Sequence, residues 1–167
     1  MNDFAKVYII SYKKNGKWND ISNVSINRFH EQGFRTELIE GYNLKDYPEI
    51  KRNHIVYLNL LDKVLNVIKK RNIKEGFFIA EDDAFPADYV TPEFLKKRLK
   101  LLSKSLKKKD RTYKNTIVRV GYQKVLNEKR SGYPRKYYCV GTQLIWIPKN
   151  LIVKLEDVMK QANAQHL

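Results

Sequence analysis

The sequence has few of the residues that build disulfide, zinc or membrane proteins. Its one cysteine, Cys139, cannot form an internal disulfide, and its three histidines are too scattered for a zinc site. Seven glycines and five prolines are too few for a low-complexity chain. No apolar run approaches the roughly 20 residues of a membrane span, and the N-terminus lacks the basic-then-apolar order of a signal peptide. These absences predict a cytoplasmic protein.

The composition that remains is that of one basic globular domain. A chain of 167 residues with 43% hydrophobic residues can form a single core, so we expect one domain over residues 1–167. The 33 lysines and arginines exceed the 18 acids and give a net charge of +15. The electric field of a protein with this charge attracts polyanions, although lysines that are merely solvated would give the same net charge.

Hydrophobic patterning alternates between strands and helices along the chain. Apolar or β-branched runs predict strands over residues 6–11, 35–39, 76–80, 116–120 and 142–147. Apolar residues at helical spacing predict helices that start at Asp20 and Thr91 as capping residues, and others over 55–68 and about 151–159. The alternation predicts an α/β fold with a mostly parallel sheet and helices on both faces.

Three acids end the most apolar of these runs. Glu81, Asp82 and Asp83 follow Gly76 to Ala80 directly, and ligands of open α/β sheets bind at the carboxyl ends of strands. Adjacent carboxylates suit Mg²⁺ or Mn²⁺ holding a diphosphate. Side-chain alternation predicts Asp83 as the metal ligand, facing the same way as Glu81, with Glu81 or Asp82 binding the ribose or a metal-held water. The alternative is a solvated turn before Pro86, but the buried strand in front favours a site.

The chain resembles glycosyltransferase family 25, the lipooligosaccharide-type and collagen-type galactosyltransferases. The similar blocks occur in order and span most of the chain: residues 7–11, 53–57, 78–84, 118–121 and 141–149. The resemblance implies a single GT-A domain, a nucleotide-sugar donor with UDP-sugar preferred, Mn²⁺ or Mg²⁺ at Asp83, and a base pocket near Ser11 and Tyr12. It is compatible with a phage-like relative that acts inside a bacterial or virus-infected cell.

Two departures from the family pattern bear on the donor and on the catalytic base. Ser11-Tyr12-Lys13-Lys14 stands where the family has an Asn-Leu-Asp-Arg-like stretch, which leaves the nucleotide open. The carboxylate expected beyond the last helix is also missing, since the sequence ends at Leu167. Either the chain is truncated there or the base lies elsewhere, with Glu81 and Asp82 as the catalytic candidates.

Further residues are candidates for binding the donor. Gly141, Thr142 and Gln143 precede the last predicted strand and offer hydrogen bonds to a sugar, or form an ordinary strand start. Arg52 begins the second predicted helix and suits a diphosphate, because helix N-termini attract anions; it can equally be a surface residue.

Two basic segments are candidates for the acceptor. The helix after Thr91 carries nine basic residues and one acid between Lys96 and Arg111, which predicts either a phosphate-binding face or a solvated one. The segment 129–138 mixes cations with tyrosines, and it either binds an acceptor or packs on the sheet. The acceptor candidates are Lys100, Lys104, Lys107, Lys108, Arg130, Tyr133 and Arg135.

These features predict transfer of a sugar from a nucleoside-diphosphate sugar to a hydroxyl acceptor, either a saccharide or a hydroxylated DNA base. A metal-dependent nucleotidyltransferase is less consistent, because the chain lacks a glycine-rich phosphate loop after the first strand. A non-catalytic nucleic-acid-binding module leaves the strand-end acids unexplained, since carboxylates weaken phosphate binding unless a metal intervenes.

Overall fold

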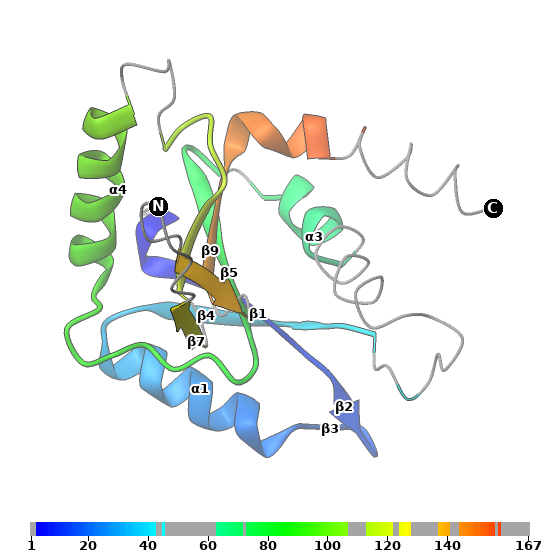
Figure 1. Cartoon of the computed structure of the whole chain (residues 1–167). Helices are drawn as coiled ribbons and strands as arrows, with labels where there is room; N and C mark the ends of the chain where they lie inside the picture. The colour runs from blue at the N-terminus through cyan, green and yellow to red at the C-terminus, as the bar shows by residue number, and fades with distance from the viewer. Residues whose placement is uncertain are drawn as a thin grey trace.

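A five-stranded sheet with helices on both faces forms the centre of the molecule (Figure 1). The computed structural model describes residues 3–42, 45, 63–71, 73–106, 113–121, 124–127, 137–140, 144–155 and 157. The strand order is β4-β1-β5-β9-β6. The strands are β1 (Lys6–Ser11), β4 (Arg35–Glu40), β5 (Gly76–Glu81), β6 (Val118–Gly121) and β9 (Leu144–Pro148). β1 is parallel to β4 and β5, whereas β9 is antiparallel to its neighbours β5 and β6, so four of these five strands run in the same direction. This confirms the predicted α/β fold with a mostly parallel sheet.

The helices divide between the two faces of the sheet. α1 (Asp20–Glu31), α4 (Pro92–Leu106) and the 3-10 helix η1 (Asp3–Ala5) pack on one face, and α3 (Leu65–Lys69) packs on the other. Strand alternation supplies both cores, because Val7 and Ile9 face the first layer while Tyr8 faces the second. No helix in the described part of the chain is long and apolar enough to cross a membrane.

Of the two predicted helix caps, one is wrong and one is correct. α1 is capped by Asn19, whose side chain accepts a hydrogen bond from the Ile21 backbone N–H at 3.2 Å. The predicted cap, Asp20, instead lies in the first turn, where a negative charge suits the helix dipole. α4 starts as predicted, with the Thr91 hydroxyl accepting from the Phe94 N–H at 3.2 Å.

Two hairpins occupy segments that lie outside the predicted strands and helices. β2 (Lys13–Lys14) pairs with β3 (Lys17–Trp18) around Asn15 and Gly16, whose φ angles of 52° and 77° are those of a tight hairpin turn. β7 (Lys124–Asn127) pairs with β8 (Tyr137–Val140) in a second antiparallel hairpin. Of the last predicted helix, the 3-10 helix η5 (Lys149–Leu151) and helical residues 152–155 are described.

Close packing fixes β5 against β9. A Cβ atom at Gly76 would lie 2.5 Å from the Ile147 carbonyl oxygen, so glycine is what allows the strands to approach. Beside this contact, Trp146 stacks on Phe4 with ring centroids 4.7 Å apart, and its Nε1–H donates to the Tyr113 carbonyl at 2.9 Å. The strand that carries the acids is therefore held rigidly at the centre of the sheet.

Candidate functional site

The strand order reverses at the carboxyl ends of β1 and β5. The chain runs from β1 through α1 to β4 on one side of β1, and β5 then lies on the other side. Open α/β sheets bind ligands in the crevice at such a switch point. Ile10 pairs with Glu81, so the next residues of the two strands, Ser11 and Asp82, lie opposite each other at this edge.

The acids form a tight turn rather than an extension of the strand. β5 ends at Glu81, and the Ala84 N–H donates to the Glu81 carbonyl at 3.1 Å, which leaves Asp82 and Asp83 at the two central positions. Strand alternation therefore stops at Glu81 and does not orient the two aspartates. Asp82, which alternation would direct away from the ligand side, faces the end of β1 instead.

A chain of hydroxyl groups leads to Asp82. The Ser11 hydroxyl lies 3.0 Å from Asp82 Oδ2 and 2.5 Å from the Ser22 hydroxyl, and both serines are buried. Ser11 has one proton, which it donates to the carboxylate, so Ser22 must be the donor to Ser11. Asn19 Nδ2 also donates to the same carboxylate oxygen at 3.4 Å. The end of β1 and the start of α1 thus fix the Asp82 side chain.

α1 is attached to the acidic turn by its serines. Ser22 and Ser25 are fully buried. Of the three apolar residues from which this helix is predicted, Phe29 is buried, whereas Ile21 and Val24 are 43% and 49% exposed. The Ser25 hydroxyl donates to the Ala84 carbonyl at 2.8 Å. Sequence reasoning missed Asn19, Ser22 and Ser25 as site residues, although serines three positions apart were a signal that they share a helix face.

Asp82 and Asp83 have no cationic partner among the described residues. Asp83 Oδ1 is buried and has no hydrogen-bond partner among the described residues, an arrangement that costs free energy unless another group satisfies it. Burial raises the pKa of Asp82, the Ser11 hydrogen bond lowers it, the Asp83 charge raises it and Asn19 lowers it, with a net rise above 3.8. Both carboxyl groups would be stabilised by a nearby cation.

The residues present fit a cation that also binds a phosphate. The described residues contain no group of three or more His, Cys, Asp or Glu side chains that could hold a metal. Mg²⁺, however, commonly binds one or two carboxylates and completes its shell with water and substrate phosphates. Asp83, with its unpartnered oxygen, and Asp82 beside it supply that smaller set.

The other predicted donor residues are only partly placed. Tyr12 lies between β1 and β2 and is 36% exposed. Glu81 is partly buried at the end of β5. Leu144 pairs with Ala80, so β9 begins at the edge where β5 ends. The remaining donor candidates lie outside the described residues: Arg52, Gly141, Thr142 and Gln143.

The acceptor candidates are described only on α4. Lys100 and Lys104 are exposed on this helix, whose leucines Leu95 and Leu99 are buried against the sheet. The predicted division of the helix into an apolar and a basic face is therefore confirmed for this stretch. The other acceptor candidates lie outside the described part: Lys107, Lys108, Arg130, Tyr133 and Arg135.

Comparisons with known proteins add no family to this geometry. No protein-family model, curated protein sequence or solved structure matches the chain. The similarity to glycosyltransferase family 25 therefore stays a prediction, carried by the sequence blocks and by the position of the acidic turn.

Proposed function

We propose that the chain is a metal-dependent glycosyltransferase that moves a sugar from a nucleoside-diphosphate sugar to a hydroxyl acceptor. The observation that carries the proposal is the pair Asp82 and Asp83 at the β1–β5 switch point, with a buried carboxylate oxygen that lacks a partner among the described residues. A diphosphate held through Mn²⁺ or Mg²⁺ fits this charge. In this proposal the described sheet is the core of a GT-A domain that works in the cytoplasm of a bacterial or virus-infected cell.

In this proposal each side chain of the site has its own role. Asp83 is the principal ligand of the cation, which neutralises the charge that develops on the diphosphate leaving group. Ser11, supported by Ser22, holds Asp82 in one orientation beside it. We assign the contact with the nucleoside to Tyr12, which follows β1 and is exposed. The net charge of +15 favours an anionic acceptor such as DNA over a neutral saccharide.

A donor screen tests the proposal. The full chain is incubated with UDP-, GDP-, ADP- and dTDP-sugars and Mn²⁺ or Mg²⁺, with and without hydroxymethylated DNA or an oligosaccharide acceptor, and nucleotide release is measured. We expect release with one donor class, dependent on the cation and stimulated by one acceptor. Absence of both binding and release with every donor would overturn the proposal.

A further inference from the structure

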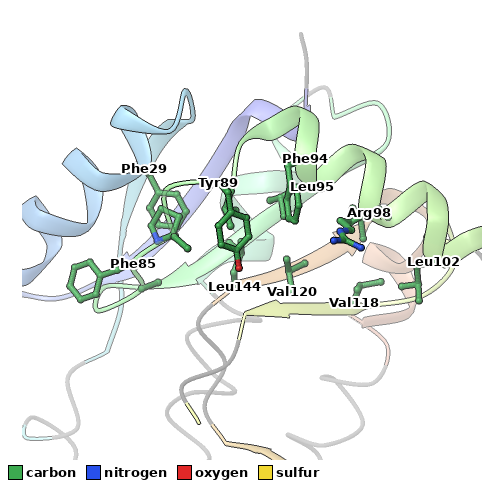
Figure 2. Close-up of a pocket in the computed structure, with 15 residues that line it drawn as sticks. Phe29, Phe85, Tyr89, Phe94, Leu95, Arg98, Leu102, Val118, Val120 and Leu144 are labelled. Carbon is green, nitrogen blue, oxygen red and sulfur yellow. The ribbon is translucent and has the colours of Figure 1, made fainter. Parts of the chain in front are cut away.

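A pocket lies between α4 and the sheet and begins beside the acidic turn, since Ala84, whose N–H closes that turn, is among the residues that line it. The segment after the turn, helix α4 and strands β6 and β9 enclose a pocket of about 530 Å³ (Figure 2). This is within the range of roughly 300–1,000 Å³ typical of small-molecule sites. Its walls are almost wholly apolar and include Phe29, Phe85, Phe94, Leu99, Val120 and Leu144.

The pocket has one charged side chain among the described residues that line it. Arg98 extends from α4 toward Val118 and Val120 of β6 (Figure 2). Its guanidinium lies 5.1 Å from the centre of the Phe94 ring, so the aromatic face holds the cation at the wall of the pocket. An arginine can grip a phosphate or carboxylate through two parallel hydrogen bonds.

Large apolar side chains mark the entrance. Phe85 and Tyr89 line the pocket, yet they are 48% and 68% exposed. Exposed apolar residues that surround a cavity are typical of a site that receives an apolar ligand. A nucleobase or sugar would lose its hydrogen bonds to water against these walls, whereas an alkyl chain would not.

We infer that this pocket binds an anionic amphiphile, an alkyl, acyl or prenyl chain whose phosphate or carboxylate head pairs with Arg98. The apolar walls suit the chain, and the lone guanidinium suits the head. The inference concerns binding alone, so it stands whether or not the acidic turn transfers sugars.

Calorimetric titration with dodecyl phosphate, kept below its critical micelle concentration, tests this inference on the full chain. We expect saturable binding of one molecule per chain, with dodecanoate competing and ethyl phosphate, which lacks the chain, binding far more weakly. Dodecyltrimethylammonium, which carries the opposite charge, should also bind weakly. Equal binding of ethyl phosphate, or no saturable binding at all, as when a segment of this chain covers the pocket, would overturn it.

Three variants distinguish binding in the pocket from nonspecific attraction of the anion to the positive charge of the protein. Arg98→Gln should weaken dodecyl phosphate binding about tenfold, the effect of one charge-assisted contact. Lys97→Gln removes the same charge from the preceding residue, which is exposed like Arg98 but does not line the pocket, and should leave binding unchanged. Val120→Trp fills the cavity and should abolish binding. If this variant does not fold, the comparison of Arg98→Gln with Lys97→Gln still tests whether binding depends on the pocket. Equal weakening by Arg98→Gln and Lys97→Gln, or wild-type affinity in a folded Val120→Trp, would contradict the inference.

Discussion

Glu37, in a strand of the sheet, and Asp82, in the turn at the end of β5, are carboxylates with opposite surroundings. Glu37 in β4 pairs with Lys6 and with Arg71, the latter at 2.7 Å; burial raises its pKa, but the two cations outweigh burial and hold the pKa below 4.5. Asp82 has a raised pKa, from burial and then from the Asp83 charge. Among the described residues no lysine or arginine pairs with Asp82 or Asp83.

The difference is informative because cations are abundant in this chain. With 33 lysines and arginines, a structural carboxylate such as Glu37 finds two partners. Within the described residues, Asp82 is instead supported by the neutral donors Ser11 and Asn19. This is the pattern expected when the counter-charge arrives with a ligand, and perturbed carboxyl groups in a crevice are candidates for function.

Replacement of Asp83 should have the largest effect. Asp83→Ala and Asp83→Asn should each lower cation-dependent nucleotide release by at least about 100-fold, since even outer partners of a bound metal are worth about 10- to 100-fold. The fold should persist, which a thermal melt would check. Asp88→Asn, an exposed acid in the following segment, is the matched control and should retain full activity. Equal activity in the Asp83 variants and the control would remove the proposed role of Asp83.

Removal of a serine hydroxyl from the hydrogen-bond chain to Asp82 should have a smaller effect, and this effect should depend on pH. Ser11→Ala removes a donor from a partly buried carboxylate, which should cost about 1–3 kcal/mol of unfolding free energy and raise the pKa of Asp82 further. Mn²⁺ affinity should therefore be reduced more as the pH falls toward the raised pKa of Asp82 than at pH 8, because a protonated carboxylate does not bind metal. Ser22→Ala keeps the Ser11–Asp82 hydrogen bond and should show a weaker pH effect. Identical pH profiles in both variants would contradict the chain of donors.

The comparison predicts opposite stability changes for two neutralising variants. Glu37→Gln should lower the melting temperature at pH 7, where its ion pairs are worth up to about 1 kcal/mol. That contribution is present above pH 4.5 and is lost as the pH falls through the lowered pKa of Glu37. The raised pKa of Asp82 gives the reverse sign, since its protonated form favours folding and that stability is lost as the pH rises through the folded pKa.

Asp82→Asn should therefore melt at or above the wild-type temperature at pH 7, and the difference should shrink as the pH falls toward 3.8. Melting curves of both variants and of wild type at several pH values show whether each substitution lowers or raises the melting temperature. A loss of stability at pH 7 in both variants would show that the two carboxylates are alike, and the comparison would fail.

Substitution of the lysines on and after α4 should have the smallest effect. If the acceptor is DNA, changing Lys100, Lys104, Lys107 and Lys108 to Gln should reduce the slope of log affinity against log salt by about 0.9 per lost duplex contact, or about 0.7 for a single strand. Nucleotide release without DNA should not change. Wild-type protein with no DNA affinity at about 50 mM salt, where charge is least screened, would exclude DNA and leave a saccharide.

Sequence patterns predicted the sheet well because strand and helix periodicity depends on local side chains. The apolar run before Glu81 became the central strand, and Thr91 became a helix cap. Two signals were present but went unused. Asn15-Gly16 is typical of a two-residue hairpin turn, and Asn19 competes successfully with its neighbour Asp20 for the cap position.

Hydrophobicity predicted only part of the inward face of α1, where Phe29 is buried. Ser22 and Ser25 are buried because they satisfy Ser11 and the Ala84 carbonyl, which are remote in the chain, while Ile21 and Val24 stay exposed. Likewise, the contact of Ser11 with Asp82 depends on the parallel register of β1 and β5. Such pairings need tertiary structure, which is why the acids were found from the sequence but Asn19, Ser22 and Ser25 were not, and why Ser11 was predicted near a base pocket and not as a partner of Asp82.

Mn²⁺ binding at the acidic turn tests the central claim most directly. Free Mn²⁺ is measured by electron paramagnetic resonance while the protein is titrated in the presence of UDP, with wild type, Asp83→Ala and Asp88→Asn compared under the same conditions. We predict one bound Mn²⁺ per chain in wild type and Asp88→Asn, and loss of this binding in Asp83→Ala. No bound Mn²⁺ in wild type, or full retention in Asp83→Ala, would contradict the claim that the turn holds a cation.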